Sequence, residues 1–352
     1  MQKLYSVSAS PHIHCGTNIS GLMWKVIIAL MPALLMGVYF FGIRALFITV
    51  YGVIGAVGME AMILFFRRKP IVVYDGSAII TGMLVGFNVN TSVPWWIPVV
   101  GAAFAIGIGK HAFGGLGHNI VNPALLGRVF LMASWPTYMT GNWQKTSMQS
   151  INGINKLVLS NLPDQISSAT PLGVLHTLRD PSFLEQHSNI VGNILHHLTA
   201  QSTLWNLFFG NTGGVIGEVS AIALLFGGLY LLVSKVIEWR ITFFYLITVF
   251  CITFLGGGAR FGVSSSLNIA LFHLLSGGLF LGAFYMATDY VTSPLSKKGR
   301  IIFGIGCGIL TVVIRLYGGY PEGVSYAILI MNLCVPIIDR FTFPKPFGEA
   351  KK

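Results

Sequence analysis

A threonine in a polar stretch of the chain has the surroundings that best permit covalent chemistry. Thr170 ends the sequence DQISSAT, which begins at Asp164, and a proline follows it. The residues just before it, Ser167, Ser168 and Ala169, are small and leave room beside the hydroxyl for a bulky substituent. Such residue types are also typical of an ordinary surface loop. Residue types alone therefore make Thr170 only a candidate site of modification.

Charged and amide side chains within apolar stretches are the next candidates, because an ionisable group inside a bilayer costs about 2.5 to 3.5 kcal/mol on insertion scales. Arg128 follows Asn122 in NPALLGR and lies too deep to reach an interface easily. A guanidinium at depth needs carbonyls, a carboxylate or a bound polar ligand, so Arg128 and Asn122 are candidate cofactor contacts. Glu60 lies near Arg67 and Arg68. It could form an ion pair with them or bind a translocated cation.

Two further ionisable residues have a simpler interpretation. Glu218 and Arg315 lie near the ends of apolar stretches. There an interfacial position accounts for a charged side chain without a functional role. We expect both to lie at the membrane surface.

The elements that must position these residues are membrane spans. Only 9% of the 352 residues are charged and 54% are hydrophobic, against roughly 25% charged in an average soluble domain. This composition excludes an ordinary soluble enzyme and a disordered chain. Ten apolar stretches approach or reach the roughly 20 residues that cross a bilayer. They cover about 22–42, 45–66, 76–90, 94–111, 119–135, 214–233, 241–257, 266–288, 301–317 and 323–339. The third and fifth are short or interrupted by Gly and Pro, which predicts broken or re-entrant segments.

The basic residues predict the sidedness of these spans. Lys and Arg number 22 against 11 Asp and Glu, a formal net charge of +11. On a soluble protein this balance would suggest nucleic acid, but in membrane proteins basic residues gather in cytoplasmic loops. With both termini cytoplasmic, the inner loops and termini carry fourteen basic residues and the outer loops five. We therefore expect both termini inside, residues 136–213 outside, and no nucleic-acid partner.

The long polar segment divides the chain into two halves of five apolar stretches. GKHAFGGLGHNIVNPALLGR in the first half and IRLYGGYPEGVSYAILIMN in the second share a basic residue, a glycine pair, a turn and a helix start. The predicted fold is an all-α polytopic membrane protein with about ten transmembrane helices in two five-helix structural repeats. The predicted divisions are a cytoplasmic segment (1–21), the first repeat (22–135), the external loop (136–213), the second repeat (214–340) and a cytoplasmic tail (341–352).

The motif before Thr170 and three further segments resemble one known family. The pattern Asp-x-x-Ser-Ser-Ala-Thr resembles the site at which a flavin transferase attaches FMN to a threonine through a phosphoester. The chain also contains DGSAIITGMLVGFN, GGLGHNIVNPALLGR and YAILIMNLCVPIIDR. Over essentially its whole length it resembles the D subunits of Rnf electron-transport complexes, which are similar to the B subunits of sodium-pumping NADH:quinone reductases.

The resemblance implies a function, cofactors and partners. Rnf complexes couple electron transfer between reduced ferredoxin and NAD to Na⁺ or H⁺ movement across the bacterial cytoplasmic (inner) membrane. It implies covalent FMN on Thr170, within the attachment motif Asp164, Ser167, Ser168 and Ala169, and riboflavin among the spans. The implied partners are the other Rnf subunits, including a second FMN-bearing subunit and iron–sulfur subunits, together with the flavin transferase and the lipid bilayer.

A second class of function stays open on the sequence. Two repeats with discontinuous helices are also how many solute carriers and pores are built. A non-redox solute or ion transporter or channel with inverted repeats is therefore the alternative. Covalent flavin separates the two hypotheses, because only the redox subunit requires it.

Overall fold

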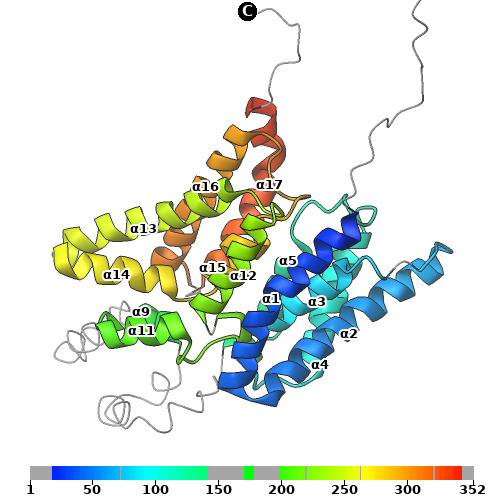
Figure 1. The fold of residues 1–352 in the computed structure, drawn as a ribbon, viewed down its shortest axis with the longest axis horizontal. Helices are drawn as coiled ribbons and strands as arrows, with labels where there is room; N and C mark the ends of the chain where they lie inside the picture. Colours follow the sequence, from blue (N-terminus) through cyan, green and yellow to red (C-terminus); the bar gives the residue numbers. More distant parts are fainter. Residues whose placement is uncertain are drawn as a thin grey trace, which may run out of the picture.

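The structure is a computed structural model that describes residues 18–71, 73–140, 170–177, 198–218, 220–261, 263–319 and 322–342, without the side chains of residues 257–265. Within these residues every regular element is a helix (Figure 1). The helices form two groups, one from α1 to α5 and one from α12 to α17. The predicted all-α fold is confirmed for the part of the chain described.

The first group contains five apolar helices, the fourth of which continues as a π-helix. The elements are α1 (Ile19–Phe41), α2 (Ile43–Phe66), α3 (Ser77–Phe87), α4 (Trp96–Phe104) with η1 (Ala105–His111), and α5 (Pro123–Ser134), followed by the short α6 (Pro136–Thr140). π-Helical turns are uncommon and often lie at functional sites. The buried polar residues of η1 are therefore candidates for a functional role.

The second group is preceded by shorter elements that lie between the two halves of the sequence. These are α9 (Pro171–Thr177), α11 (Gln201–Phe209) and the 3₁₀ turn η2 (Ile216–Glu218). The group itself consists of α12 (Ala221–Val233), α13 (Trp239–Phe261), α14 (Val263–Leu275), α15 (Leu279–Leu281) with the π-helix η3 (Gly282–Met286), α16 (Lys297–Tyr317) and α17 (Val324–Thr342).

Helix lengths support a multi-pass membrane protein. Five helices, α1, α2, α13, α16 and α17, are long and apolar enough to span a bilayer. A bent pair, Ser266–Leu275 with Leu279–Met286, forms a sixth candidate. Four shorter apolar helices cover Ser77–Phe87, Trp96–His111, Pro123–Ser134 and Ala221–Val233. The described helices thus include fewer full-length spans than the ten expected, and the ten-span count stays a prediction.

The clearest interruption of a helix lies in a stretch that the sequence analysis predicted to be one continuous span. The third and fifth stretches form short helices of 11 and 12 residues, as predicted. The eighth stretch, expected over 266–288, bends by 61° between α14 and α15. Gly277 has φ +66°, a left-handed conformation that favours glycine. Its neighbour Gly278 gives the same segment a second residue without a side chain, so the chain turns there.

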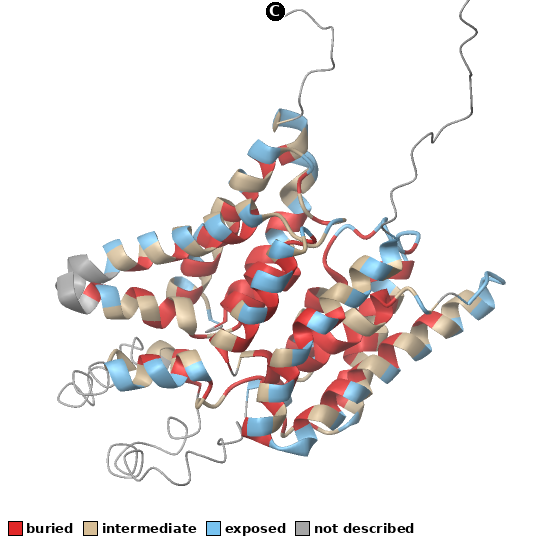
Figure 2. Cartoon of the chain, in the orientation of Figure 1, coloured by how far each residue is buried: buried red, intermediate tan, exposed pale blue. Residues whose placement is uncertain are grey.

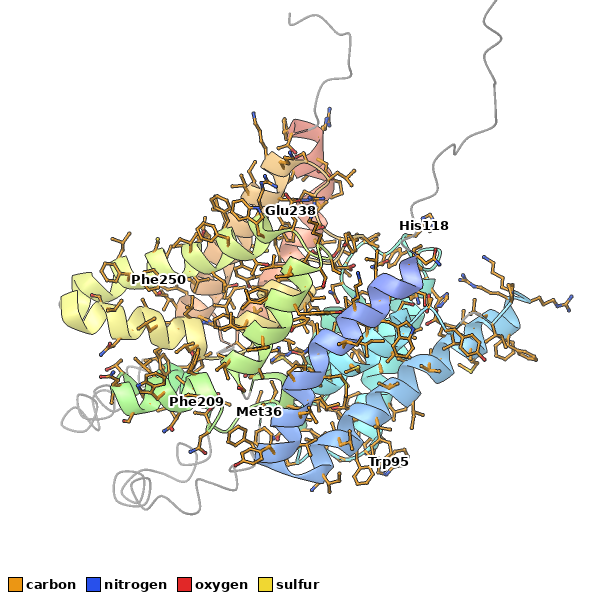
Figure 3. The ribbon with its side chains drawn as sticks, viewed as in Figure 1. Met36, Trp95, His118, Phe209, Glu238 and Phe250 are labelled. Carbon is orange, nitrogen blue, oxygen red and sulfur yellow. The ribbon has the colours of Figure 1, made fainter. Side chains whose placement is uncertain are left out.

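The surface facing outward is rich in large apolar side chains. Phe226, Val233 and Leu255 are 73%, 82% and 70% exposed, which suits contact with lipid but not with water. Buried residues concentrate along the facing sides of the helices (Figure 2). Exposed aromatic residues also lie at the helix ends: Trp95 precedes α4 and Phe209 ends α11 (Figure 3).

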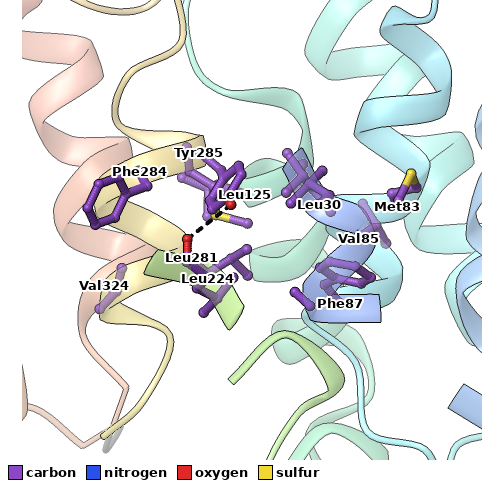
Figure 4. Close-up of a cluster of buried hydrophobic side chains, with 14 of the residues drawn as sticks. Leu30, Met83, Val85, Phe87, Leu125, Leu224, Leu281, Phe284, Tyr285 and Val324 are labelled. Atoms are coloured by element: carbon purple, nitrogen blue, oxygen red, sulfur yellow. Dashed lines mark hydrogen bonds between the residues drawn. The ribbon is translucent and has the colours of Figure 1, made fainter. Parts of the chain in front are cut away.

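Close packing joins the two groups at the centre. The helix α1 packs on α12, and α5 contacts α17. A Cβ on Gly227 of α12 would lie 1.9 Å from the carbonyl oxygen of Ala29 on α1, so only glycine permits this approach. The Tyr285 hydroxyl lies 3.1 Å from the carbonyl oxygens of both Ala29 and Leu224. Apolar side chains from both groups surround this contact (Figure 4).

Candidate functional site

Thr170 lies at the start of α9, against the second group of helices. Its hydroxyl oxygen accepts a hydrogen bond from the Gly173 amide at 3.2 Å, and its carbonyl accepts one from Val174 at 2.9 Å. The following Leu172 packs with Leu204, Leu207 and Phe272 on α11 and α14. This small apolar cluster holds the threonine beside the break between α14 and α15. The side chain of Thr170 is only 6% exposed.

The pocket beside Thr170 is small and lined by both polar and apolar residues. Its volume is about 10 Å³, room for about one water molecule. Its walls include Thr212, Ser276, Glu218 and Glu322. Two carboxylates and three hydroxyls therefore meet where the segments at Thr170, Glu218, Ser276 and Glu322 converge.

Arg128 lies next to this pocket and joins both halves of the protein. One guanidinium nitrogen donates to Asn88 Oδ1 at 2.8 Å, and the other pairs directly with Glu322 Oε2. Glu218 Oε1 lies 3.8 Å from the second nitrogen. All three charged side chains are at least nine-tenths buried. Both terminal nitrogens of the guanidinium thus have carboxylate or amide partners supplied by the protein, while Nε has no hydrogen-bond partner among the described residues.

A second buried arginine stabilises the break that bounds the pocket. Arg315 on α16 donates to the carbonyl oxygens of His273 at 2.5 Å and Ser276 at 3.0 Å. These carbonyls are at the end of α14, where the helix leaves oxygen atoms without helical partners. A Cβ on Gly277 would lie 3.0 Å from Arg315 Nη2. The arginine therefore caps the end of α14 from the side.

Glu218 and Arg315, expected at the membrane surface, are buried within the protein, so contact with water at an interface does not account for their charges. Arg315 is 3% exposed, and the Glu218 side chain is 6% exposed. The helices around them pack closely enough to exclude solvent, and the compensating charges come from other parts of the chain. Position along an apolar stretch did not reveal this, because it carries no information on which helices cover a side chain.

Asn122 serves as a joint between the two groups. Its side-chain oxygen accepts hydrogen bonds from the amides of Ala124 and Leu125 and so caps the start of α5. Its Nδ2 donates to the Met286 carbonyl oxygen at 3.1 Å, across 164 residues of sequence. The amide is therefore occupied by protein contacts, and its predicted contact with a cofactor stays untested.

Glu60 belongs to a separate buried cluster at the other end of the first group. Its Oε1 lies 2.6 Å from Lys110 Nζ, which also donates to Ser77 Oγ at 2.7 Å. His111 Nε2 lies 3.5 Å from the same carboxylate oxygen. Arg67 instead donates to the His111 carbonyl. The expected pairing of Glu60 with the arginines after α2 is therefore wrong.

Lys110 is itself buried, with only 3% of the residue exposed. The π-helical turn η1 keeps the chain helical to His111 and directs this lysine inward. Glu60, the candidate for the ion path, is thus part of a buried ion pair.

The described residues fit a phosphoester on Thr170, within limits. The Gly173 amide can donate to an ester oxygen as it does to the hydroxyl. Space for one water does not hold an isoalloxazine ring, and Glu218 and Glu322 would repel a phosphate inside the pocket. Since Thr170 is nearly buried, attachment has to precede or displace the packing around it.

The remaining motif residues lie outside the part of the chain described. These are Asp164, Ser167, Ser168 and Ala169. The structure therefore places Thr170 in one pocket with Glu218 and Glu322, the carboxylates beside Arg128, but does not describe the rest of the attachment motif.

Two residues of the Arg128 network were not singled out from the sequence. Glu322 lies 194 residues from Arg128, between α16 and α17, and Asn88 follows α3. With only 11 acidic residues in the chain, each carboxylate beside an apolar stretch was a possible partner for a buried arginine. The small number of acidic residues is therefore the signal by which Glu322 could have been predicted as a partner of Arg128.

The fold and this site define a class of protein. The chain is a polytopic α-helical membrane protein whose halves meet at a buried network of charges next to a candidate modification site. Over residues 6–348 it matches the NQR2, RnfD, RnfE family. The chain belongs to this family.

Similar proteins span nearly the same length. The D subunit of the Na⁺-translocating ferredoxin:NAD⁺ oxidoreductase complex of Acetobacterium woodii is 44% identical, covering 98% of this chain and 96% of that protein. The D subunit of the proton-translocating ferredoxin:NAD⁺ oxidoreductase complex of Clostridium ljungdahlii is 42% identical, with coverages of 99% and 98%. The D subunit of the ion-translocating oxidoreductase complex of Stutzerimonas stutzeri is 38% identical, covering 95% and 93%.

Proposed function

We propose that this chain is the membrane subunit of an electron-transport complex that couples electron transfer between ferredoxin and NAD(H) to translocation of Na⁺ or H⁺. The observation that carries the proposal is full-length similarity to D subunits of such complexes, at 44% and 42% identity. Its multi-pass helical fold suits a subunit that acts within a membrane. Catalysis requires the assembled complex, with a second FMN-bearing subunit and iron–sulfur subunits as partners.

The proposed cofactors are FMN, attached to Thr170 by a flavin transferase, and riboflavin among the spans. When bound, a flavin accepts electrons singly or in pairs and passes them on. Support for the attachment site comes from the motif and from the placement of Thr170, which starts a helix and faces a protein-lined pocket. The riboflavin proposal rests on the family resemblance alone.

The residues around Thr170 have defined tasks in this proposal. The Gly173 amide orients the threonine oxygen, and the cluster of Leu172 with α11 and α14 holds α9 in place. Arg315 fixes the end of α14, and Arg128 joins α5 to the segment before α17. The site is thereby attached to both halves of the membrane domain, so movement of one half against the other would reach Thr170.

The proposed topology has both termini in the cytoplasm and residues 136–213 outside the bacterial inner membrane. Support comes from the basic residues and from exposed Trp95 and Phe209, which lie at one end of the helices (Figure 3). Aromatic residues often mark membrane interfaces. Two five-helix repeats are part of the proposal. In the first group α2 packs on α3 and α4, and in the second group α13 packs on α14 and α16.

Detection of the covalent flavin tests the proposed function. The complex is expressed with its flavin transferase and separated by SDS gel, and a fluorescent band is expected near 38.2 kDa. The band should vanish in Thr170→Ala and persist in Thr212→Ala, a matched loss of a hydroxyl from the same pocket. A fluorescent Thr170→Ala band would contradict the attachment site.

A non-redox transporter is the competing outcome. It predicts purified protein without flavin that still moves a solute or ion into liposomes. Detection of that combination would replace the proposed function.

A further inference from the structure

A larger cavity lies between two connections in the second group of helices. Its volume is about 520 Å³, within the usual range of ligand sites. One wall is the connection from α12 to α13, and the other runs from the end of η3 to Arg300 on α16. The Tyr290 hydroxyl donates to the Val236 carbonyl oxygen and so joins the two walls. We call this space the α12–α13 cavity.

Basic side chains outnumber carboxylates at the α12–α13 cavity. Lys235, Glu238 and Arg300 line it, and Glu238 pairs with both Arg300 and the neighbouring Arg240. One carboxylate is thus shared by two guanidinium groups. The Lys235 ammonium has no ion pair among the described residues. Two positive charges stay unbalanced, so the cavity attracts an anion.

The surrounding charges keep this balance positive. Asp289 does not line the cavity, and its carboxylate accepts hydrogen bonds from a backbone amide and from the Thr292 hydroxyl of its own loop. Lys297 and Lys298 are exposed in the first turn of α16, the helix that carries Arg300. They add positive charge beside the cavity.

The backbone at Lys235 is unusual for a lysine. It has φ +54°, the left-handed conformation that glycine usually supplies just after a helix. The Val236 amide donates to the Leu231 carbonyl oxygen at 2.9 Å, a bond typical of that helix end. Strained backbone of this kind is found most often at functional sites. The chain thus keeps a charged side chain at the cavity where glycine would relieve the strain.

An apolar surface continues from the cavity along two helices. Trp239 lines the cavity and is half exposed, and Phe243, one turn further along α13, packs on its ring with centroids 5.9 Å apart. Leu229 and Val233 on α12 are exposed as well. Basic and aromatic side chains beside exposed apolar helix faces are typical of the membrane interface. Basic pockets between spans on the cytoplasmic side bind the headgroups of anionic lipids.

Two other anions or cofactors fit the cavity less well. A free inorganic phosphate would fill only a small part of 520 Å³ and would not use the apolar surface beside it. Riboflavin, proposed among the spans, is neutral and does not need two unbalanced cations. An anionic phospholipid uses both the charge and the apolar surface.

We propose that the α12–α13 cavity binds the phosphate headgroup of an anionic phospholipid. Lys235 and Arg300 lie beside the phosphate, and the acyl chains follow the exposed apolar side chains of α12 and α13. Glu238 lies toward the opposite end of the helices from Trp95 and Phe209 (Figure 3). Only the assignment to the inner leaflet rests on the proposed topology, and the site itself is independent of the flavin.

The site is tested by native mass spectrometry of the purified full-length chain, freed of bound lipid in detergent. The chain is titrated with phosphatidylglycerol, which is anionic, and with phosphatidylcholine, which has no net charge. One tightly bound phosphatidylglycerol is expected, with an affinity roughly tenfold or more above that for phosphatidylcholine, because two cations favour the anionic headgroup. Excess inorganic phosphate should not displace the lipid, since it lacks acyl chains.

Substitution of Lys235 tests the headgroup contact. Lys235→Gln should weaken phosphatidylglycerol binding roughly fivefold, the contribution of one basic residue near a membrane surface. It leaves the fold intact because the ammonium has no ion pair to lose among the described residues. Lys235→Arg should restore the affinity. The matched control is Lys69→Gln, which removes an exposed lysine outside the cavity.

Four results would overturn the lipid site. The first is equal affinity for the two lipids, and the second is an equal loss of affinity in Lys235→Gln and Lys69→Gln. The third is displacement of the lipid by inorganic phosphate, which would identify a site for the free anion. The fourth is loss of non-covalent flavin from Lys235→Gln, which would assign the cavity to riboflavin. Loss of the covalent flavin in Thr170→Ala tests the proposed function separately and should leave lipid binding unchanged.

Discussion

At the scale of single residues, Arg128 is explained by its partners. A buried charge is stable only when hydrogen-bonded and paired. The pairing carboxylate of Glu322 and the amide oxygen of Asn88 meet this need from two distant parts of the chain. A buried arginine that the protein itself pairs does not in itself indicate a ligand.

The Arg128–Glu322 pair predicts a large loss of stability when one partner is removed. Glu322→Gln should reduce the free energy of unfolding by about 3 kcal/mol, because the buried guanidinium loses the carboxylate that pairs with it directly and keeps only Glu218, whose Oε1 lies 3.8 Å away. Denaturant unfolding in detergent micelles measures the difference. Glu238→Gln is the control, since its partly exposed pairs should contribute about 1 kcal/mol or less. Equal losses in the two variants would contradict the account.

The buried Lys110 predicts a similar effect at the second cluster. Lys110→Met should destabilise the protein by about 3 kcal/mol, because Glu60 then keeps a buried charge without its lysine. Lys235→Met removes an exposed lysine of similar size and should change stability by less than about 0.5 kcal/mol. Thermal unfolding followed by tryptophan fluorescence compares them. An unchanged melting temperature in Lys110→Met would show that the pair contributes little.

Residue types indicated Arg128 and Thr170 as sites of interest, but they did not predict which residues surround them. The depth of Arg128 followed from its place in an apolar stretch, whereas Glu322 is 194 residues away. Glu60 illustrates the opposite error, because nearby arginines in the sequence suggested a partner while the actual one comes from η1. The local sequence shows which charges need partners, and tertiary packing decides which residues those partners are.

At the scale of elements, glycine decides how closely helices approach. Gly227→Ala should destabilise the contact of α1 with α12 by about 1 to 3 kcal/mol or more, because the new Cβ would meet the Ala29 carbonyl oxygen at 1.9 Å. Gly58→Ala on α2 is the matched control, with no atom near its added Cβ. There alanine should be neutral or stabilising because of its higher helix propensity. Denaturant unfolding distinguishes the variants, and equal stability would refute the close contact.

The break after α14 shows why element boundaries were only partly predictable. The run from 266 to 288 is predominantly apolar, so hydropathy favours one continuous span. Gly277 and Gly278 permit a turn, but similar glycines lie within helices elsewhere in the chain. Arg315 makes the difference, because it binds the carbonyls that the turn exposes. That contact crosses 42 and 39 residues and is invisible to a local pattern.

At the scale of the whole molecule, basic residues predict orientation across the membrane. In a variant without its native cysteines, Gln201→Cys should react with an impermeant maleimide in spheroplasts. Lys298→Cys should react only after the membrane is opened, since cytoplasmic loops retain positive charge. Both positions are exposed. Reaction of Lys298→Cys in intact spheroplasts would reverse the proposed topology.

The central claim concerns the covalent flavin on a membrane subunit, and intact mass measures it most directly. The chain purified from cells with the flavin transferase should carry the added mass of one FMN phosphoester, mapped after proteolysis to the peptide containing Thr170. Thr170→Ala should have the mass of the bare polypeptide. An unmodified native chain from such cells, or an FMN mass mapped to another peptide, would contradict the account.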